Sequence, residues 1–262
     1  MRSILIITLS LIVNIPLVAQ DKQVSIANTE SFEIQSKEVD DKYNISVSFP
    51  FGYNQSAKEY AVLYVLDANV TFAMVRDIQL LASFEPENAS LLVVGVGYEN
   101  FNSWMSKRSR DYISNGKGEA SKFLAFIENE LIPEIDQRYR TNSQRIIYGH
   151  SSAALFGLFA LFNSTSFEGF IVTSPSVDED EEFTFRLEEA SKSKQLKGRV
   201  YASFGTKEKQ LFKSKYQEFV EQLKSRNHQQ LKIMSEEFDG SHMTTMAPAF
   251  LNGLLFVTKE QF

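Results

Sequence analysis

Short apolar runs and stretches of helical periodicity follow one another along most of this chain. Residues 43–49 alternate between apolar and polar side chains, which is typical of a strand with one buried face. Later runs rich in apolar residues predict further strands at 60–66, 91–96, 145–148, 169–173, 200–204 and 231–238. Apolar residues at helical spacing predict a helix over 120–139, kinked by Pro133, and more helices from Leu155, Phe183, Phe212 and Met243.

This alternation of strands and helices predicts an α/β fold. Helices between successive strands favour parallel crossovers, so we expect a doubly wound, mostly parallel sheet with helices on both faces. In open sheets of this kind, ligands bind at the carboxyl ends of the strands. Candidate catalytic side chains are therefore expected in the turns that follow strands.

The junction between the strand at 145–148 and the helix from Leu155 carries a nucleophile motif. Its residues are Gly-His-Ser-Ser-Ala, with Ser151 at the centre. A serine on a sharp strand-to-helix turn exposes its oxygen, and the helix N-terminus favours developing negative charge. Small residues two positions away let helix and strand pass closely, and Gly149 and Ala153 are small. We predict the nucleophile elbow of the α/β-hydrolases; the alternative is an ordinary turn in which Ser151 caps the helix.

The chain has three histidines, and they differ in position. His150 precedes the predicted nucleophile and is expected to point away from the site. His228 lies in a polar stretch and is expected to be a solvated surface residue. His242 follows the strand at 231–238 late in the chain, where a general base comes after the nucleophile and the acid. Its neutral imidazole can take the serine proton and return it to the leaving alcohol. The alternative for His242 is a helix-capping or merely exposed residue.

The acid that would orient His242 has two candidates. Glu208 follows the strand at 200–204 and lies between nucleophile and base in chain order, so its carboxylate would accept the second imidazole N–H. Its alternative is a solvated position, since charged runs usually lie at the surface. Asp239 is the alternative acid. The acidic run at 178–182 is interpreted as a helix start, where carboxylates interact favourably with the helix dipole.

These motifs resemble those of a known family over residues 43–255. The chain is similar to the esterase group of the α/β-hydrolases that includes esterase D and the trilactone siderophore esterases. Besides the elbow, the resemblance rests on Tyr-Val-Leu-Asp at 64–67, Arg-Asp-Tyr at 110–112, the helix at 123–140 and Ser-Pro-Ser at 174–176. It implies the α/β-hydrolase fold, with Ser151 as nucleophile, His242 as base and Glu208 at the acid position.

The resemblance also implies how an oxyanion would be held. One donor would be the backbone N–H of Ala68 or of the adjoining Asn69, and the other the N–H of Ser152. Ala68 stands where the family has glycine, and Ala153 and Ala154 replace its Gly-Gly pair. These changes add methyl groups and remove no catalytic atom. Some siderophore esterases of the family use a Ser–His dyad, so the need for an acid is left open.

Composition narrows the function classes. The net charge of −6 and the pI near 5.3 argue against nucleic acid or an anionic membrane as a partner. No metal or organic cofactor is implied, because the chain has neither a His-Glu-x-x-His motif nor a phosphate-cradling glycine loop. With 43% hydrophobic residues and no repeat or linker, residues 20–262 are expected to form one domain. The sheet and its helices use most of that domain, so no large lid is expected.

Residues 1–19 have the pattern of a signal peptide. A basic start at Arg2 precedes an almost wholly apolar stretch over 4–18, and Ala19 offers a small residue for cleavage. The stretch is too short and too soon polar for a comfortable membrane span, although an uncleaved anchor is the alternative. We therefore expect an exported protein, periplasmic or secreted, without a stable membrane span after cleavage.

The predicted function is a serine carboxylic-ester hydrolase that acts on a small-molecule ester through an acyl-enzyme. A siderophore trilactone esterase is the alternative among enzymes. A catalytically impaired binding protein of the same fold is the alternative from another class, because alanines replace the family's glycines. The segment at 100–118 is expected to be a loop at the mouth and shows no recognisable pocket chemistry, so it predicts neither the acyl nor the alcohol group. The sequence predicts no oligomeric state.

Overall fold

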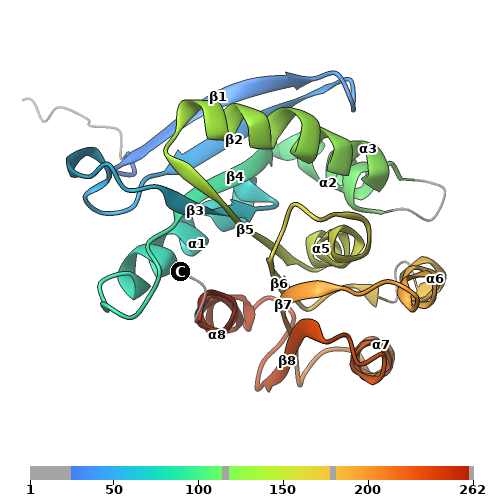
Figure 1. Ribbon diagram of the computed structural model, residues 1–262. Coiled ribbons are helices and arrows are strands. Elements are labelled where there is room, and N and C mark those ends of the chain that lie inside the picture. The colour runs from blue at the N-terminus through green and yellow to red at the C-terminus, as the bar shows by residue number, and fades with distance from the viewer. Residues whose placement is uncertain (1–24, 114–117, 178–180, 260–262) are drawn as a thin grey trace, which may run out of the picture.

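The computed structural model describes residues 25–113, 118–177 and 181–259. Within them the strands form one eight-stranded sheet in the order β1-β2-β4-β3-β5-β6-β7-β8 (Figure 1). β2 is antiparallel to both β1 and β4, whereas all pairs from β4 to β8 are parallel. The strands are β1 (Thr29–Ser36), β2 (Asp41–Ser48), β3 (Tyr60–Val65), β4 (Leu92–Tyr98), β5 (Thr141–His150), β6 (Gly169–Thr173), β7 (Lys197–Gly205) and β8 (Gln230–Phe238).

The mostly parallel α/β sheet confirms the predicted fold class, and each strand expected from the sequence is present. β1 was not predicted. It lies at the edge of the sheet, and its apolar residues Phe32 and Ile34 are only partly buried between exposed polar side chains. Two apolar positions in a polar stretch give a weak alternating pattern, so pairing with β2 rather than local sequence defines this strand.

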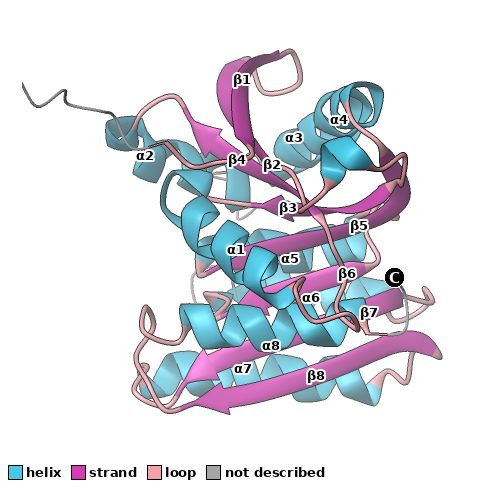
Figure 2. Ribbon diagram, turned by 90° about the vertical axis from the view of Figure 1, so that its left-hand side faces the viewer, coloured by secondary structure: helices cyan, strands magenta, loops and turns pink. Residues whose placement is uncertain are grey.

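Helices cover both faces of the sheet (Figures 1 and 2). α1 and α8 lie against each other on one face, and α5 packs on β5 and β6 on the other face, beside α2, α3 and α6. Each face has its own apolar cluster. The helices are α1 (Ala68–Ala82), α2 (Phe101–Tyr112), α3 (Ala120–Phe126), α4 (Ile132–Arg138), α5 (Ser152–Asn163), α6 (Glu181–Ser191), α7 (Gln210–Ser225) and α8 (Met246–Thr258).

The segment at 100–118 differs from the sequence expectation, because α2 occupies most of it. Asn100 caps this helix, and its side chain accepts a hydrogen bond from the N–H of Ser103 at 2.9 Å. Its buried side chains include Arg108 and Asp111, which are charged and paired. A helix that buries charges has no clear apolar stripe, so its periodicity could not be recognised. α1 was not predicted either.

The helix expected over 120–139 consists of three consecutive segments. α3 leads into a π-helical stretch, η2 (Ile127–Leu131), and α4 follows directly. Pro133 lies within the first two residues of α4. Because proline has no N–H to donate, it is tolerated at the start of a helical segment, and the widened turn precedes it.

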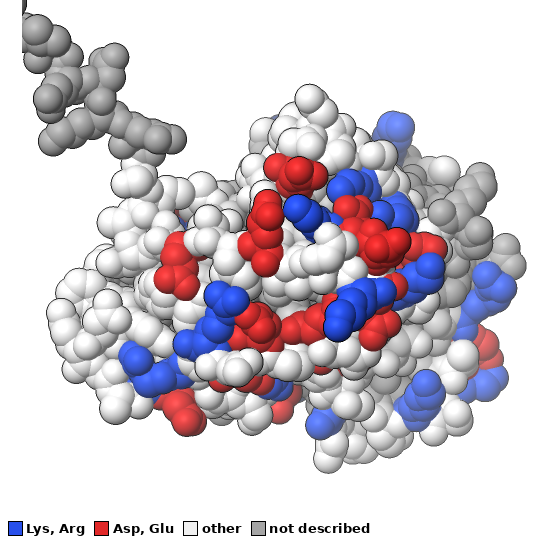
Figure 3. All heavy atoms as spheres, turned by 90° about the horizontal axis from the view of Figure 1, so that it is seen from above, with Lys and Arg blue, Asp and Glu red and all other residues white. Residues whose placement is uncertain are grey.

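Charges of both signs are interspersed on the face formed by β1 and the α3–α4 segment (Figure 3). Arg138 pairs there with Glu134, and Lys42 lies 3.8 Å from Glu33. Neither sign forms a large field on this face. In the part of the chain that the structure describes, no helix has the length and apolar character needed to cross a bilayer. The predicted signal peptide at 1–19 lies outside the described residues, as does 178–180 of the acidic run.

Candidate active site

Ser151 occupies a sharp turn between β5 and α5. Its φ of 61° and ψ of −127° are unusual for a residue with a side chain, and its N–H donates to the carbonyl of Thr173 at 3.0 Å. Its side chain makes no capping hydrogen bond to the helix, which disfavours the alternative of an ordinary cap. Ser151 therefore lies where the predicted elbow requires it, at the carboxyl end of a central strand.

The close approach of strand and helix at the elbow explains its small residues. A Cβ atom on Gly149 would lie 2.2 Å from the carbonyl oxygen of Ala153, so only glycine fits. Ala153 and Ala154 are fully buried and packed in the core beneath the turn. The methyl groups that depart from the family pattern are thus accommodated by this chain.

His242 and Glu208 lie side by side, although they are far apart in the sequence. The imidazole Nδ1 is 2.8 Å from Oε2 of Glu208. An ionised carboxylate can only accept, so Nδ1 carries the proton and donates it. The other oxygen of Glu208 accepts hydrogen bonds from the hydroxyl of Ser174 at 2.8 Å and from the N–H of Gly205 at 2.7 Å.

These bonds determine the ionisation of Glu208. Its side chain is only 4% exposed, and burial by itself would raise its pKa. The hydrogen bonds from His242, Gly205 and Ser174 outweigh burial and hold the pKa of Glu208 below its ordinary value. The carboxylate is therefore charged at neutral pH and can stabilise a positive imidazole.

Asp239, the alternative acid, points away from this arrangement. Its side chain is 84% exposed, and its carboxylate lies 3.2 Å from the ammonium group of Lys207. The hydrogen bond to Lys207 lowers the pKa of Asp239. The structure thus brings Glu208, and not Asp239, to the imidazole.

Ser151, His242 and Glu208 line one cavity of about 360 Å³ at the carboxyl ends of the strands. Its other lining residues are Ser176, Lys207, Lys209, Phe212 and Ser241. The hydroxyl of Ser151 lies 3.1 Å from that of Ser176. The Ser-Pro-Ser segment after β6 thus contacts both the predicted nucleophile and, through Ser174, the predicted acid.

The other two histidines are not where the sequence analysis expected them. His150 does not point away: its ring is buried, and its centroid lies 4.6 Å from that of His242. His228 is not a solvated residue, because it is buried and its Nδ1 accepts a hydrogen bond from the N–H of Leu196 at 3.4 Å. Both expectations were wrong, because the packing of neighbouring strands, rather than local polarity, decides where these rings lie.

The residues expected to hold an oxyanion lie at two helix N-termini. Ser152 begins α5, and Ala68 and Asn69 begin α1. Backbone N–H groups in the first turn of a helix have no partner within that helix, and the helix dipole favours negative charge there. The side chain of Asn69 is occupied by the backbone of Tyr98, at 2.7 and 2.9 Å, so only its N–H could serve.

A buried arginine at the same place was missed by the sequence analysis. Arg108 on α2 donates to both carboxylate oxygens of Asp67 at 2.9–3.1 Å, and its Nη1 lies 3.4 Å from the hydroxyl of Ser152. Trp104 also donates to Asp67, at 2.8 Å. Burial by itself would lower the pKa of Arg108, but its bonds to Asp67 raise it, so the group stays positively charged.

Arg108 is 8% exposed and lies next to the residue that follows the predicted nucleophile. The sequence contained a signal next to it, since the Arg-Asp-Tyr motif at 110–112 begins two residues after Arg108. That motif was assigned to Arg110 and Asp111, which pair with each other at 2.6 Å. Arg108 is buried because it pairs with Asp67, which precedes α1. That partner is distant in the sequence, so the sequence does not show which arginine of the helix points inward.

Known proteins resemble this chain in sequence and in fold. The ferri-bacillibactin esterase BesA of Bacillus subtilis is 30% identical over 183 residues, covering 62% of this chain and 63% of that protein. The siderophore triacetylfusarinine C esterase of Aspergillus fumigatus is 28% identical over 173 residues, covering 59% and 58%. The matched region thus spans about three fifths of the length of these relatives.

A solved structure extends the likeness over nearly the whole chain. The BES protein from Bacillus cereus superposes with a TM-score of 0.83 at 27% identity, covering 92% of this chain and 98% of that one. The family Esterase matches residues 36–253, which include the elbow, Glu208 and His242. This chain belongs to that esterase family.

Proposed function

We propose that the protein is a serine carboxylic-ester hydrolase. The observation that carries the proposal is the shared cavity, which both Ser151 and His242 line and at which the imidazole donates to Glu208 at 2.8 Å. A serine at a strained turn, a histidine as base and a buried carboxylate bonded to that histidine form the arrangement that activates a serine for attack on an acyl group. Membership of an esterase family supports ester bonds as the target.

The arrangement suggests a two-step reaction. The hydroxyl oxygen of Ser151 attacks the ester carbonyl carbon, and Nε2 of His242 takes the hydroxyl proton. Glu208 holds the resulting imidazolium through Nδ1–H. The imidazolium then protonates the leaving alcohol, which leaves an acyl-enzyme. The same imidazole then takes a proton from water, which attacks the acyl-enzyme carbonyl carbon. The imidazolium returns that proton to the oxygen of Ser151 as the acid leaves.

Positive potential at the elbow would stabilise the negative oxygen of each tetrahedral intermediate. The N–H groups of Ser152 and of Ala68 or Asn69 are the backbone donors we propose, and the helix dipoles of α5 and α1 act in the same sense. The buried guanidinium of Arg108, held by its ion pair with Asp67, places the positive end of that pair next to Ser152. Such preorganised charge is usually the largest single contribution to catalysis of this kind.

The favoured substrate is a small ester, and a siderophore ester is the specific candidate. Two relatives are named as esterases of ferri-bacillibactin and of triacetylfusarinine C. The cavity favours a polar substrate, because Lys207 and Lys209 line it together with Phe212. Comparing kcat/KM for cyclic trilactone siderophores and for short aryl esters would distinguish the two substrate classes.

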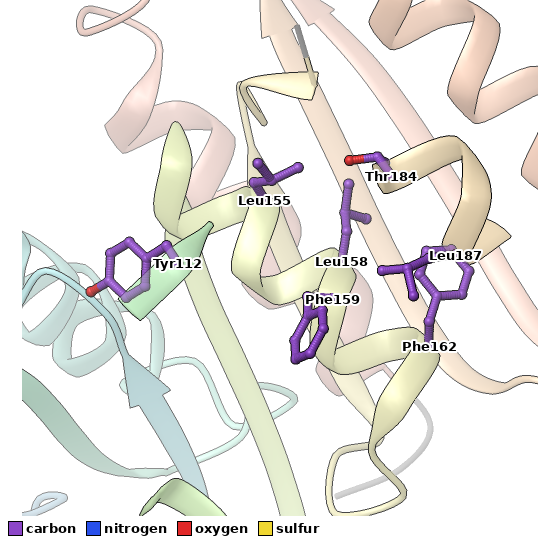
Figure 4. Close-up of a pocket in the computed structure, with 7 residues that line it drawn as sticks. All are labelled: Tyr112, Leu155, Leu158, Phe159, Phe162, Thr184 and Leu187. Carbon is purple, nitrogen blue, oxygen red and sulfur yellow. The ribbon is translucent and has the colours of Figure 1, made fainter. Parts of the chain in front are cut away.

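A long acyl chain is not a favoured substrate. The pocket between α5 and α6 has a volume of only about 10 Å³, and all its lining residues except Thr184 have large, mainly apolar side chains (Figure 4). Those residues are Tyr112, Leu155, Leu158, Phe159, Phe162, Thr184 and Leu187. A space of this size holds no more than one water molecule, so these side chains pack against one another and offer no acyl-binding tunnel.

Replacement of the nucleophile tests the proposal. We expect Ser151→Ala to lower kcat for p-nitrophenyl acetate on the order of 10⁶-fold and to abolish covalent labelling by a fluorophosphonate probe, because the attacking oxygen is lost. His242→Ala should cost about as much, since the two residues act as a unit. The unfolding temperature of each variant should stay close to that of the wild type.

Two results would reject the proposal that the protein is a serine hydrolase acting through Ser151. Wild-type protein that is not labelled by the probe would indicate a binding protein of this fold that has lost activity. Activity of Ser151→Ala above a hundredth of the wild-type value would mean that another residue attacks the ester.

Export to the periplasm or outside stays a prediction, which N-terminal sequencing of the mature protein would test at Gln20.

A further inference from the structure

His150 is a buried ionisable residue that the proposed reaction does not use. It ends β5 and is 6% exposed, and its Nδ1 lies 3.0 Å from the hydroxyl oxygen of Thr173. The hydroxyl of Thr173 donates its one proton to the carbonyl of Gly149 at 3.3 Å. We therefore assign the proton of the neutral ring to Nδ1, because the hydroxyl oxygen of Thr173 can then accept from His150 while its proton goes to Gly149.

The ring of His150 is neutral in the working range of such a hydrolase. Burial lowers the pKa of His150 to about 3, with smaller effects in the same direction from His242 and Arg108 and an opposite effect from Glu208. Among the described residues, nothing forms a hydrogen bond with its buried Nε2. The ring thus presents an uncharged aromatic face inside the site.

That face lies against His242. The ring centroids are 4.6 Å apart, and the planes are inclined by 51°. Phe212 is a second neighbouring ring, with its centroid 6.1 Å from that of His242 and the planes at 88°. The imidazole of His242 is 37% exposed, and its Nδ1 is hydrogen-bonded to Glu208. A single bond through Nδ1 leaves rotation about that bond unrestricted, whereas two flanking rings restrict it.

We propose that His150 is a positioning residue for His242, with a neutral ring that forms the inner wall against which the imidazole rests so that Nε2 faces Ser151. The inference rests on the proposed function, because it assigns His242 as the base. The sequence places this wall directly before the nucleophile, so one strand end carries both the attacking serine and the support of its base.

Two physical requirements explain why this position suits a histidine held neutral. A cation at this distance would repel the imidazolium that forms during the reaction, and the buried site prevents that charge. A flat aromatic ring also restricts another ring better than a flexible side chain does, since offset and tilted contacts between rings are favourable. The bond to Thr173 fixes the orientation of the wall itself.

The experiment compares two substitutions that separate the ring from its hydrogen bond. His150→Phe keeps an aromatic face and loses the bond to Thr173, whereas His150→Asn keeps a donor and loses the ring. We expect His150→Asn to lower kcat for p-nitrophenyl acetate about 10- to 100-fold with KM changed less than about 3-fold, and to slow fluorophosphonate labelling in parallel. His150→Phe should retain kcat within about 5-fold of the wild type. Thermal unfolding of each variant checks that the fold persists.

Outcomes in the opposite direction overturn the inference. Wild-type kcat in His150→Asn would show that the ring is not needed, and an equal loss in a folded His150→Phe would assign the role to the hydrogen bond. If His150→Phe fails to fold, the NMR signal of the Nδ1 proton between His242 and Glu208 provides the test. In His150→Asn we expect this signal to broaden or vanish. A signal that stays sharp would show that the ring of His150 does not position His242. Absence of labelling in the wild type would instead reject the proposed function.

Discussion

At the scale of single residues, Glu208 shows how a charged side chain in a polar stretch can be functional. The sequence offers only Lys-Glu-Lys at 207–209, a pattern that usually lies at the surface. In the fold, both lysines line the mouth of the cavity, and the glutamate between them turns inward to three hydrogen-bond donors. Position after a strand, and not local composition, was the informative signal.

Glu208→Gln should therefore lower kcat far more than Asp239→Asn. The amide keeps the shape of the side chain but cannot stabilise the imidazolium, and it favours the wrong tautomer of His242, so we expect a loss on the order of 10²–10⁴-fold. Asp239→Asn is a matched control, because that carboxylate is 84% exposed and pairs with Lys207. The measurement is kcat for p-nitrophenyl acetate.

If both substitutions leave kcat within a few-fold of the wild type, the reaction runs on a Ser–His dyad. If Asp239→Asn is the damaging change, the acid lies on the loop before His242.

The three histidines differ in how far their positions could be predicted from the sequence. The position of His242 in the cavity with Glu208 agrees with the prediction, because chain order and a strand end are both visible in the sequence. The surroundings of His150 and His228 were not visible, since each ring packs on a residue from another strand or loop: Thr173 and His242 for the first, Leu196 for the second. Long-range packing of this kind leaves no local trace.

At the scale of elements, the elbow depends on the close approach of β5 and α5. A Cβ on Gly149 would meet the backbone of Ala153 at 2.2 Å, and backbone cannot move as a flexible side chain can. Overpacking of this kind typically costs 1–3 kcal/mol. We expect Gly149→Ala to lower the unfolding temperature by roughly 2–12 °C. Ala153→Gly, which restores the family pattern, should have a smaller effect, so equal stability of the two variants would contradict this account of the turn.

α2 supplies the charge that the sequence analysis did not find. Arg108 reaches from this helix to Asp67 at the start of α1 and to Ser152 at the start of α5, so it joins the two helix ends proposed to hold the oxyanion. The helix was missed because its inward side chains are charged. A pattern of apolar residues cannot reveal an element that is held by ion pairs.

Arg108→Lys should lower kcat while the protein remains folded. Lysine keeps the positive charge but cannot bind the carboxylate of Asp67 in two places, so the charge is no longer fixed beside Ser152. Loss of one preorganised donor typically costs 10²–10³-fold in kcat, and we expect a loss on the order of 10²-fold. Lys107→Ala is the control on the same helix, because Lys107 pairs with Asp41 at 2.7 Å. Similar kcat values for the two variants would remove Arg108 from the proposed mechanism.

At the scale of the whole molecule, the fold class and the place of the site could be predicted, whereas the shape of the mouth could not. Alternating strands and helices predict a parallel sheet. In a parallel sheet the carboxyl ends of the strands lie at one edge, where the active site is expected. The mouth is built from side chains on loops and helices that meet only in the fold, such as Lys209 and Ser241. Its chemistry therefore needs the structure.

The mouth predicts a preference among substrates. The cavity of about 360 Å³ is lined by serines, lysines and Glu208, with Phe212 as its aromatic wall, and the apolar pocket beside α5 is only about 10 Å³ in volume. A long acyl chain would find little apolar surface there, and each CH₂ group left in water forgoes about 0.8 kcal/mol of binding.

We expect kcat/KM on p-nitrophenyl esters to be highest from acetyl to butyryl and to fall toward palmitoyl, without activation at a lipid interface. The measurement is a series of acyl lengths at substrate concentrations below micelle formation, with Ser151→Ala as the background. Because Phe212 is the one large apolar side chain among the described residues that line the cavity, methylenes beyond its reach would remain hydrated in the bound state and give no gain in transition-state binding. A maximum at twelve or more carbons would mean that the packed side chains around Leu155 and Phe159 open to admit the chain.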